Sequence, residues 1–137
     1  MKRTAPLAVS ALIVGTLIGS FGTQALHAQQ QGVKRTPLMQ KGLAGIEGKE
    51  ALMVLAEIAP GAQGGRHYHP GTEIAYVLSG TGALEVDGQG PSDLKEGTHA
   101  MLVPKTIHNA KNPGSTPLKI LVVVIHPKGE PGIVPVQ

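Results

Sequence analysis

Residues 61–80 read GAQGGRHYHPGTEIAYVLSG, and this stretch decides how the rest of the chain can fold. If the chain is extended at His67 and His69, both imidazoles leave the same face, because side chains two apart in a strand point the same way. The Pro-Gly-Thr sequence that follows is typical of a tight turn. Glu73 then opens the next strand.

The predicted strand 73–78 is largely apolar on both faces. One face carries Glu73, Ala75 and Val77, and the other carries Ile74, Tyr76 and Leu78. A carboxylate on such a strand is costly to bury without a partner. A cation held jointly by Glu73 and the two histidines removes that cost. Tyr76, on the face opposite Glu73, is expected in the core.

A fourth candidate ligand lies in residues 97–112, GTHAMLVPKTIHNAKN. An apolar strand is expected at 100–103, followed by a turn at 104–106 and then by His108. A His-x-His pair alone is a weak signal of a metal site. Three histidines and Glu73 together are a much stronger one, and they would leave open positions on a six-coordinate ion.

These spacings resemble the two sequence motifs of the cupin superfamily. The first motif is matched at every fixed position, by Gly61, His67, His69, Glu73 and Gly80. The second is resembled by Gly97, Pro104, His108 and Asn112. This second segment differs from the cupin motif in three ways. The spacings on either side of Pro104 are off by one residue, Thr106 stands where glycine is usual, and Thr98 stands where aspartate is frequent. The resemblance covers roughly residues 34–131, and the segment 81–96 between the motifs is short for the family.

The resemblance implies a metal site and a fold. It gives His67, His69, Glu73 and His108 as ligands of one divalent transition metal, in a single antiparallel jelly-roll β-barrel. Imidazole and carboxylate ligands suit Fe, Mn, Co, Ni or Zn, and we favour Fe or Mn. Cupin-like chains often pair through their sheets, which implies a homodimer.

The remaining chain independently predicts an all-β fold. Short strands are expected at 51–58, 81–86 and 118–125, separated by Gly and Pro turns, and no 3.6-residue apolar period follows residue 28. Such a pattern favours a closed antiparallel structure, for which the jelly roll is one solution. Strand 81–86 is expected to form a hairpin with 73–78 through Ser79-Gly80. Strand 118–125 is almost wholly aliphatic, which predicts burial on both faces.

Residues 1–28 are typical of a secretory signal, and residues 29–137 are expected to form the cupin domain. Lys2 and Arg3 precede an uncharged apolar stretch at 7–22, and Leu26-His27-Ala28 is a plausible cleavage site. Cleavage after Ala25 or retention as an uncleaved membrane anchor are the alternatives. Signal cleavage predicts an exported protein, periplasmic or extracellular, without membrane attachment.

The composition of residues 29–137 excludes some classes of partner. Ten basic and nine acidic residues give a net charge of +1, and Tyr68 and Tyr76 are the only aromatic residues. A nucleic-acid surface therefore lacks both electrostatic and stacking support. The length suits one domain. Because the chain has no cysteine, its fold depends on hydrophobic burial without disulfides.

An open metal site with these ligands favours a small-molecule substrate with adjacent oxygen atoms, such as an enediol or a catechol-like group. The ion would lower the pKa of a bound hydroxyl, and with iron(II) dioxygen chemistry becomes available. Glu73 would serve as a ligand or as a general base. The alternative is a non-catalytic binding or sensing domain. An isomerase ranks lower, because no second acid is evident near the motif.

Several other polar residues have two interpretations. Arg66 would either pair with a substrate carboxylate or lie solvated on the surface, and the latter is commoner. His99 and His126 are expected to be structural, and Asn112 to belong to a turn. The aliphatic residues exceed what one small barrel needs, which also favours a homodimer. The surplus residues are Leu52, Val54, Leu121, Val123 and Ile125.

Overall fold

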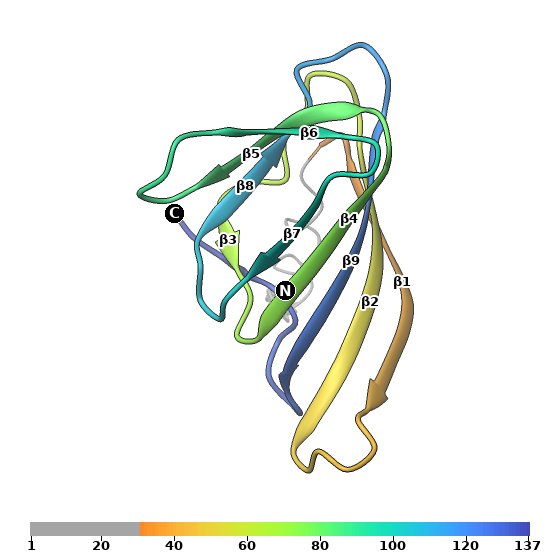
Figure 1. Ribbon diagram of the computed structural model, residues 1–137, viewed down its shortest axis with the longest axis vertical. Coiled ribbons are helices and arrows are strands. Elements are labelled where there is room, and N and C mark those ends of the chain that lie inside the picture. The colour runs from red at the N-terminus through yellow and green to blue at the C-terminus, as the bar shows by residue number, and fades with distance from the viewer. Residues whose placement is uncertain (1–30) are drawn as a thin grey trace, which may run out of the picture.

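The computed structural model describes residues 31–137, which form two antiparallel sheets of five strands each (Figure 1). The first sheet has the order β1 (Val33–Gly42), β2 (Lys49–Ile58), β9 (Leu118–Pro127), β4 (Thr72–Ser79) and β7 (His99–Leu102). The second has the order β10 (Val134–Pro135), β3 (His67–Tyr68), β8 (His108–Lys111), β5 (Thr81–Val86) and β6 (Ser92–Lys95). The predicted all-β jelly-roll fold is confirmed.

The predicted signal sequence, residues 1–28, lies outside the described residues, as do the two alternatives to its cleavage after Ala28. Within 31–137, no helix has the length and hydrophobicity to cross a membrane.

Strand β9 lies at the centre of the first sheet because its aliphatic, mostly β-branched side chains suit a pleated, largely buried surface. It pairs with β2 over its whole length, and with β4 on its other side. Its inward side chains alternate with Leu121, Val123 and Ile125, which are only partly buried. The prediction that this strand is buried on both faces is therefore wrong for its outward face.

The hydrophobic core fills one end of the space between the sheets. Its buried members are Val33, Ile58, Val77, Leu94, Leu118 and Ile120. They come from both sheets, so their burial holds the two layers together. The other end of this space contains the polar residues described below.

The predicted hairpin of strands 73–78 and 81–86 is wrong. Strand β4 pairs with β9 and β7, whereas β5 pairs with β8 and β6, so the chain passes from one sheet to the other at this point. Gly80 makes the corner, with a φ of 84°. A side chain there would collide with the carbonyl group of Pro117. Close packing on the segment before β9 thus displaces the hairpin that Ser79-Gly80 favours locally.

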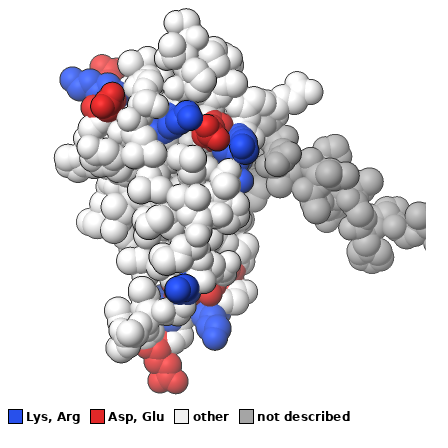
Figure 2. All heavy atoms as spheres, turned by 90° about the vertical axis from the view of Figure 1, so that its right-hand side faces the viewer, with Lys and Arg blue, Asp and Glu red and all other residues white. Residues whose placement is uncertain are grey.

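The outer face of the first sheet is more apolar than alternation on a solvated sheet predicts. Tyr76 is 47% exposed, so its expected place in the core is wrong: Glu73 faces the interior and Tyr76 faces outward. Leu52 and Val54, predicted as surplus, line the interior. On the side of the molecule where β1 and β2 lie, charged side chains gather at the two ends, and the broad surface between them has none (Figure 2).

Candidate metal centre

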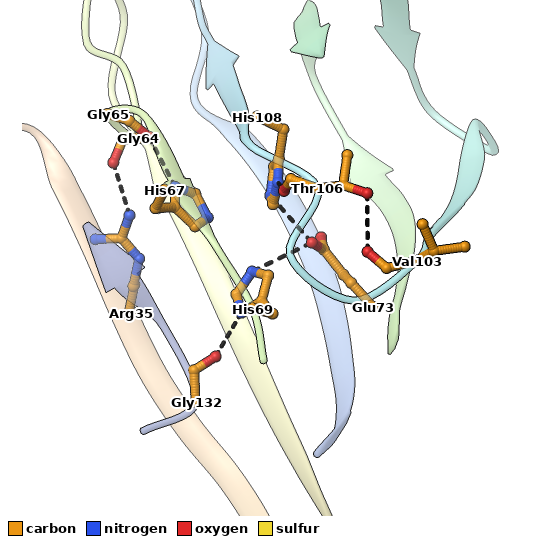
Figure 3. Close-up of polar contacts among 10 residues, drawn as sticks. All are labelled: Arg35, Gly64, Gly65, His67, His69, Glu73, Val103, Thr106, His108 and Gly132. Carbon is orange, nitrogen blue, oxygen red and sulfur yellow. Dashed lines mark hydrogen bonds and ion pairs between the residues drawn. The ribbon is translucent and has the colours of Figure 1, made fainter. Parts of the chain in front are cut away.

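Three histidines and one glutamate from both sheets converge in the barrel interior (Figure 3). His67 lies on β3 directly opposite His108 of β8, and His69 follows β3 by one residue. Glu73 approaches from β4 in the other sheet. His69, Glu73 and His108 are buried, and His67 is partly buried. The structure thus brings together all four residues that the sequence predicts as ligands.

The nitrogen and oxygen atoms of this cluster are close enough to share one ion. Potential ligand atoms of the three histidines lie within 4.8 Å of one another. Oε2 of Glu73 lies 3.2 Å from Nε2 of His69 and 3.0 Å from Nε2 of His108. Ligand bonds of about 2.0–2.2 Å to a central ion are compatible with such separations.

Backbone carbonyls determine which ring nitrogen of each histidine faces the centre of the cluster. The Nδ1 atoms of His67, His69 and His108 contact the carbonyl oxygens of Gly65 at 2.7 Å, Gly132 at 2.5 Å and Thr106 at 3.0 Å. A carbonyl oxygen only accepts, so we assign the proton to Nδ1 in the neutral ring. Each Nε2 then carries a lone pair. This arrangement is typical of histidines that ligate metals.

The carboxylate of Glu73 provides a test of whether a cation fits. Its Oε2 is buried and makes no hydrogen bond of good geometry within residues 31–137, although two imidazoles lie close by. A buried carboxylate oxygen without a partner is costly. With neutral imidazoles, its lone pairs would face those of the two Nε2 atoms. A divalent cation removes both problems, so the residues present fit a metal ion.

In the absence of an ion, the side chains of the cluster shift one another's pKa values. Burial would raise the pKa of Glu73, but the close approach of the His108 and His69 imidazoles outweighs it and lowers the pKa to about 2. Burial opposes charging of His108, yet Glu73 and the Thr106 carbonyl raise its pKa. Burial lowers the pKa of His67 to about 4, against the Gly65 carbonyl. Glu73 and His108 therefore each favour the charged form of the other.

The turn before His108 explains how a departure from the cupin spacing still aims this residue at Glu73. Lys105 has a φ of 66°, a left-handed conformation that glycine adopts more easily than lysine. The amide of Lys105 donates to the carbonyl of His69 at 2.8 Å, and the Thr106 hydroxyl donates to the Val103 carbonyl at 2.8 Å. These bonds hold the turn against the first motif.

The turn between His69 and Glu73 requires a glycine. Gly71 is buried, and a side chain there would collide with the backbone of Ile125 on β9. This close approach lets β4 start immediately beside β9, with Glu73 in register with Val124. The prediction of a turn here is confirmed.

The cluster lies in the wall of a cavity of about 260 Å³. Most of the lining is aliphatic, from the inward side chains of β2, β4, β7 and β9. Small-molecule sites span roughly 300–1,000 Å³. The cavity therefore suits a small ligand with an apolar body.

Arg35 of β1 also lines this cavity, and the sequence motifs gave no signal for it. Arg66, the arginine beside the histidines in sequence, does not line it. Its guanidinium lies 2.5 Å from Oδ2 of Asp87 at the surface. Of the two interpretations of Arg66, the structure therefore supports the surface role.

Of the other polar motif residues, His126 and Asn112 are buried within the fold, and His99 lines the cavity. His126 is buried beside Glu50, with Nε2 and Oε1 3.7 Å apart, away from the cluster. His99 is exposed. The Asn112 side chain donates to the carbonyls of Ile58 and Thr116 and accepts from the amide of Gly114, which confirms its place in a turn.

A cupin-domain family model matches residues 54–124, just over half of the chain. The chain therefore belongs to the cupin family. An uncharacterized protein of Methanocaldococcus jannaschii is 39% identical to this cupin over 56 residues, which are 41% of this chain and 43% of that protein. The chain thus spans less than half the length of that curated relative.

Solved structures share the fold. A Klebsiella pneumoniae protein with a double-stranded β-helix domain is 25% identical, with a TM-score of 0.63 over 78% of this cupin and 86% of that chain. A cupin superfamily protein of Desulfitobacterium hafniense is 19% identical, with a TM-score of 0.59 over 72% of this cupin and 82% of that chain. DMSP lyase DddQ of Ruegeria pomeroyi is 21% identical, with a TM-score of 0.62 over 75% of this cupin and 51% of the lyase.

Proposed function

We propose that this cupin is a metal-dependent dioxygenase for a small, oxygen-rich substrate, with the ion held by His67, His69, Glu73 and His108. The supporting observation is that ligand atoms of three histidines lie within 4.8 Å of one another, two of them beside a buried oxygen of Glu73, at the wall of an apolar cavity. Four protein ligands would leave positions for exchangeable groups, whereas structural zinc sites are usually closed at four.

Iron(II) or manganese(II) is the proposed ion, and zinc, nickel or cobalt would also suit three imidazoles and one carboxylate. When bound, the ion supplies Lewis acidity and, in the case of iron, redox chemistry with dioxygen. The residues of the chain position the ligands and the substrate. The carbonyls of Gly65, Gly132 and Thr106 hold the imidazoles in one orientation, and the aliphatic lining of the cavity excludes water.

Glu73 is proposed as a ligand in preference to a general base. A base works best when its pKa lies near the working pH. The pKa of Glu73 is lowered to about 2, because two imidazoles outweigh the effect of burial. Such a carboxylate accepts a proton poorly near neutral pH but binds a cation readily.

Oxygen consumption tests the enzymatic proposal. When a catechol-like or enediol substrate is cleaved and both atoms of dioxygen enter the product, the substrate supplies all the electrons and no other reductant is needed. Iron-loaded protein is therefore expected to consume one dioxygen per molecule of substrate converted, as measured with an oxygen electrode and by mass spectrometry of the product. The His69→Ala variant, which loses a ligand, should consume none above the rate of free iron.

A non-catalytic binding or sensing domain is the second candidate. It is favoured by the fact that Glu73, which already contacts two imidazoles, is the only carboxylate among the described residues that lines the cavity. An acid and a base on opposite sides of a substrate, which an isomerase needs, are not present among these lining residues. Ligand that saturates the metal-loaded protein and is recovered unchanged would support the binding domain over the enzyme.

Export of this cupin to the periplasm or the extracellular space is also proposed, on the basis of the signal-like residues 1–28. The N-terminal sequence of protein recovered from the exporting cell tests it. Mature protein starting at Gln29 agrees with cleavage after Ala28, and intact Met1 contradicts cleavage.

We further propose a homodimer that pairs the outer face of the first sheet. Ile74, Tyr76 and Leu78 of β4 and Met101 of β7 are exposed there. They carry no charge, and a two-fold interface requires only that one patch be complementary to itself. An apolar patch satisfies this condition, and exposed apolar patches mark interaction sites.

A further inference from the structure

Among residues 31–137, Arg35 is the only cationic side chain apart from the histidines that lines the cavity. It comes from β1, the edge strand of the first sheet, and its register partner is Ala56 of β2. One nitrogen, Nη2, donates to the carbonyl of Gly64 at 2.9 Å, which directs the guanidinium toward the segment before His67 (Figure 3). Arg35 therefore lies on the same side of the cavity as the metal centre.

The charge of Arg35 has no counterion within residues 31–137. Lys34, Lys111, Lys119 and Arg66 all have a carboxylate within 4.0 Å, but no such contact is formed by Arg35. Glu73 is the only carboxylate that the described part of the chain contributes to the cavity wall, and it faces His69 and His108. A partly buried charge without a partner is costly, so its retention in an apolar cavity is unusual.

The donors of Arg35 suit a carboxylate. A guanidinium has five N–H groups in a planar fork, and the bond to Gly64 engages one nitrogen. The remaining N–H groups form no hydrogen bond within the described residues and can bind two oxygens of one carboxylate in parallel. A metal ion of charge +2 with Glu73 leaves the centre positive, so an anion compensates both the ion and Arg35.

We infer that Arg35 binds the carboxylate of the substrate, which is a small organic acid with an apolar body and an oxygen-donor group at its other end. The oxygen donors meet the metal centre, the body contacts the aliphatic lining, and the acid end meets the guanidinium. This inference rests on the proposed metal site and specifies its substrate class. In this proposal Arg35 makes the site specific for acids over neutral molecules of the same shape.

A matched pair of probes tests the inference in the zinc-loaded protein, because zinc carries out no redox chemistry. The probes are 3,4-dihydroxybenzoate and the neutral, similarly shaped 3,4-dihydroxybenzamide, titrated by calorimetry. The wild-type chain is expected to bind the acid roughly tenfold or more tightly than the amide, as befits a charge-assisted hydrogen-bonded pair. In Arg35→Met the ratio should fall to about one.

Lys34→Met is the matched control. Lys34 is the neighbour of Arg35 on β1, but its side chain is 73% exposed, so the variant removes the same charge outside the cavity. It should keep the wild-type ratio. Arg35→Lys retains the charge without the fork and should keep only part of the preference. Circular dichroism of each variant verifies the fold, since Arg35→Met loses one bond to Gly64.

The outcomes separate this inference from the metal site. If zinc binds and Arg35→Met keeps the wild-type ratio, or the wild type shows no preference for the acid, the inference is overturned and the metal site stands. If no zinc binds, the metal site fails, and the same probes are titrated into the metal-free chain. A preference for the acid that is lost only in the Arg35 variants then supports the anion site, and its absence overturns it.

Discussion

Nε2 of His108, on one sheet of the barrel, lies 3.0 Å from Oε2 of Glu73, on the other sheet. Both side chains are buried. The Thr106 carbonyl accepts the proton of Nδ1, so the neutral ring presents a lone pair to the carboxylate. A proton or a metal ion between the two atoms would relieve this contact, and in the proposed site a metal ion takes the place of the proton.

Metal uptake is expected to release a proton from His108. Glu73 raises the pKa of this histidine, so the metal-free protein holds the proton at about pH 6.5, whereas a ligating imidazole must be neutral. Calorimetric titration with Mn²⁺ in buffers of different ionisation enthalpy measures about one proton released. The release should fall toward zero well above the raised pKa. Uptake without proton release at pH 6.5 contradicts this account of the contact.

Glu73→Gln is expected to weaken metal binding on the order of 100-fold or more, because the variant removes the only anionic ligand of the proposed set. Glu50→Gln is the matched control. Glu50 is also a buried glutamate beside a histidine, His126, but it lies outside the cluster. Competition with a chromogenic chelator gives both affinities. Equal losses in the two variants would indicate a general effect on the fold.

The metal-free protein is expected to lose stability in two steps as the pH falls. The pKa of His67 is lowered to about 4, so the stability that its neutral form contributes is present above its ordinary 6.5 and lost between 6.5 and 4. The pKa of Glu73 is lowered to about 2, so its contribution is lost between 4.5 and 2. The raised pKa of His108 acts oppositely, contributing stability that disappears as the pH rises above 6.5.

Urea titrations of the metal-free chain between pH 3 and 9 measure these steps as changes in the free energy of unfolding. His67→Ala should abolish the step between pH 6.5 and 4 and retain the lower one. An identical pH profile in the wild type and this variant would contradict the assignment to His67.

The proposed dimer is expected to dissociate when Met101 is replaced by lysine. Met101 is 68% exposed and lies on the apolar outer face, so a charge there opposes self-association without disturbing the interior. Sedimentation velocity should show a dimer for the wild type and a monomer for Met101→Lys. Ile46→Lys, at an exposed apolar position in the loop between β1 and β2 that is 54% accessible, should remain dimeric. A monomeric wild type would refute the dimer.

The proximity of His67, His69 and Glu73 could be predicted from sequence because it follows from short-range rules, whereas His108 was added by the resemblance to the second cupin motif. Strand alternation places His67 and His69 on one face, and the turn at Gly71 returns the chain so that Glu73 lies opposite them. The same alternation predicted the inward and outward faces of β4. It did not say which face was exposed, and Tyr76 was therefore misplaced.

Long-range pairing could not be predicted by the same means. Gly80 reads as a hairpin turn until its packing against Pro117 is known. Gly132, which accepts from His69, and Arg35, which lines the cavity, lie far from the motif in sequence. Arg35 is placed at the cavity only by the pairing of β1 with β2, which the motifs do not predict.

Elemental analysis of the protein tests the central claim most directly. Untagged protein from its native compartment is compared with a His67→Ala, His108→Ala double variant whose fold is verified by circular dichroism. We predict about one equivalent of iron or manganese per wild-type chain, from one shared site, and essentially none in the variant. Absence of metal from the wild type even after reconstitution, or equal metal in both proteins, would contradict the account.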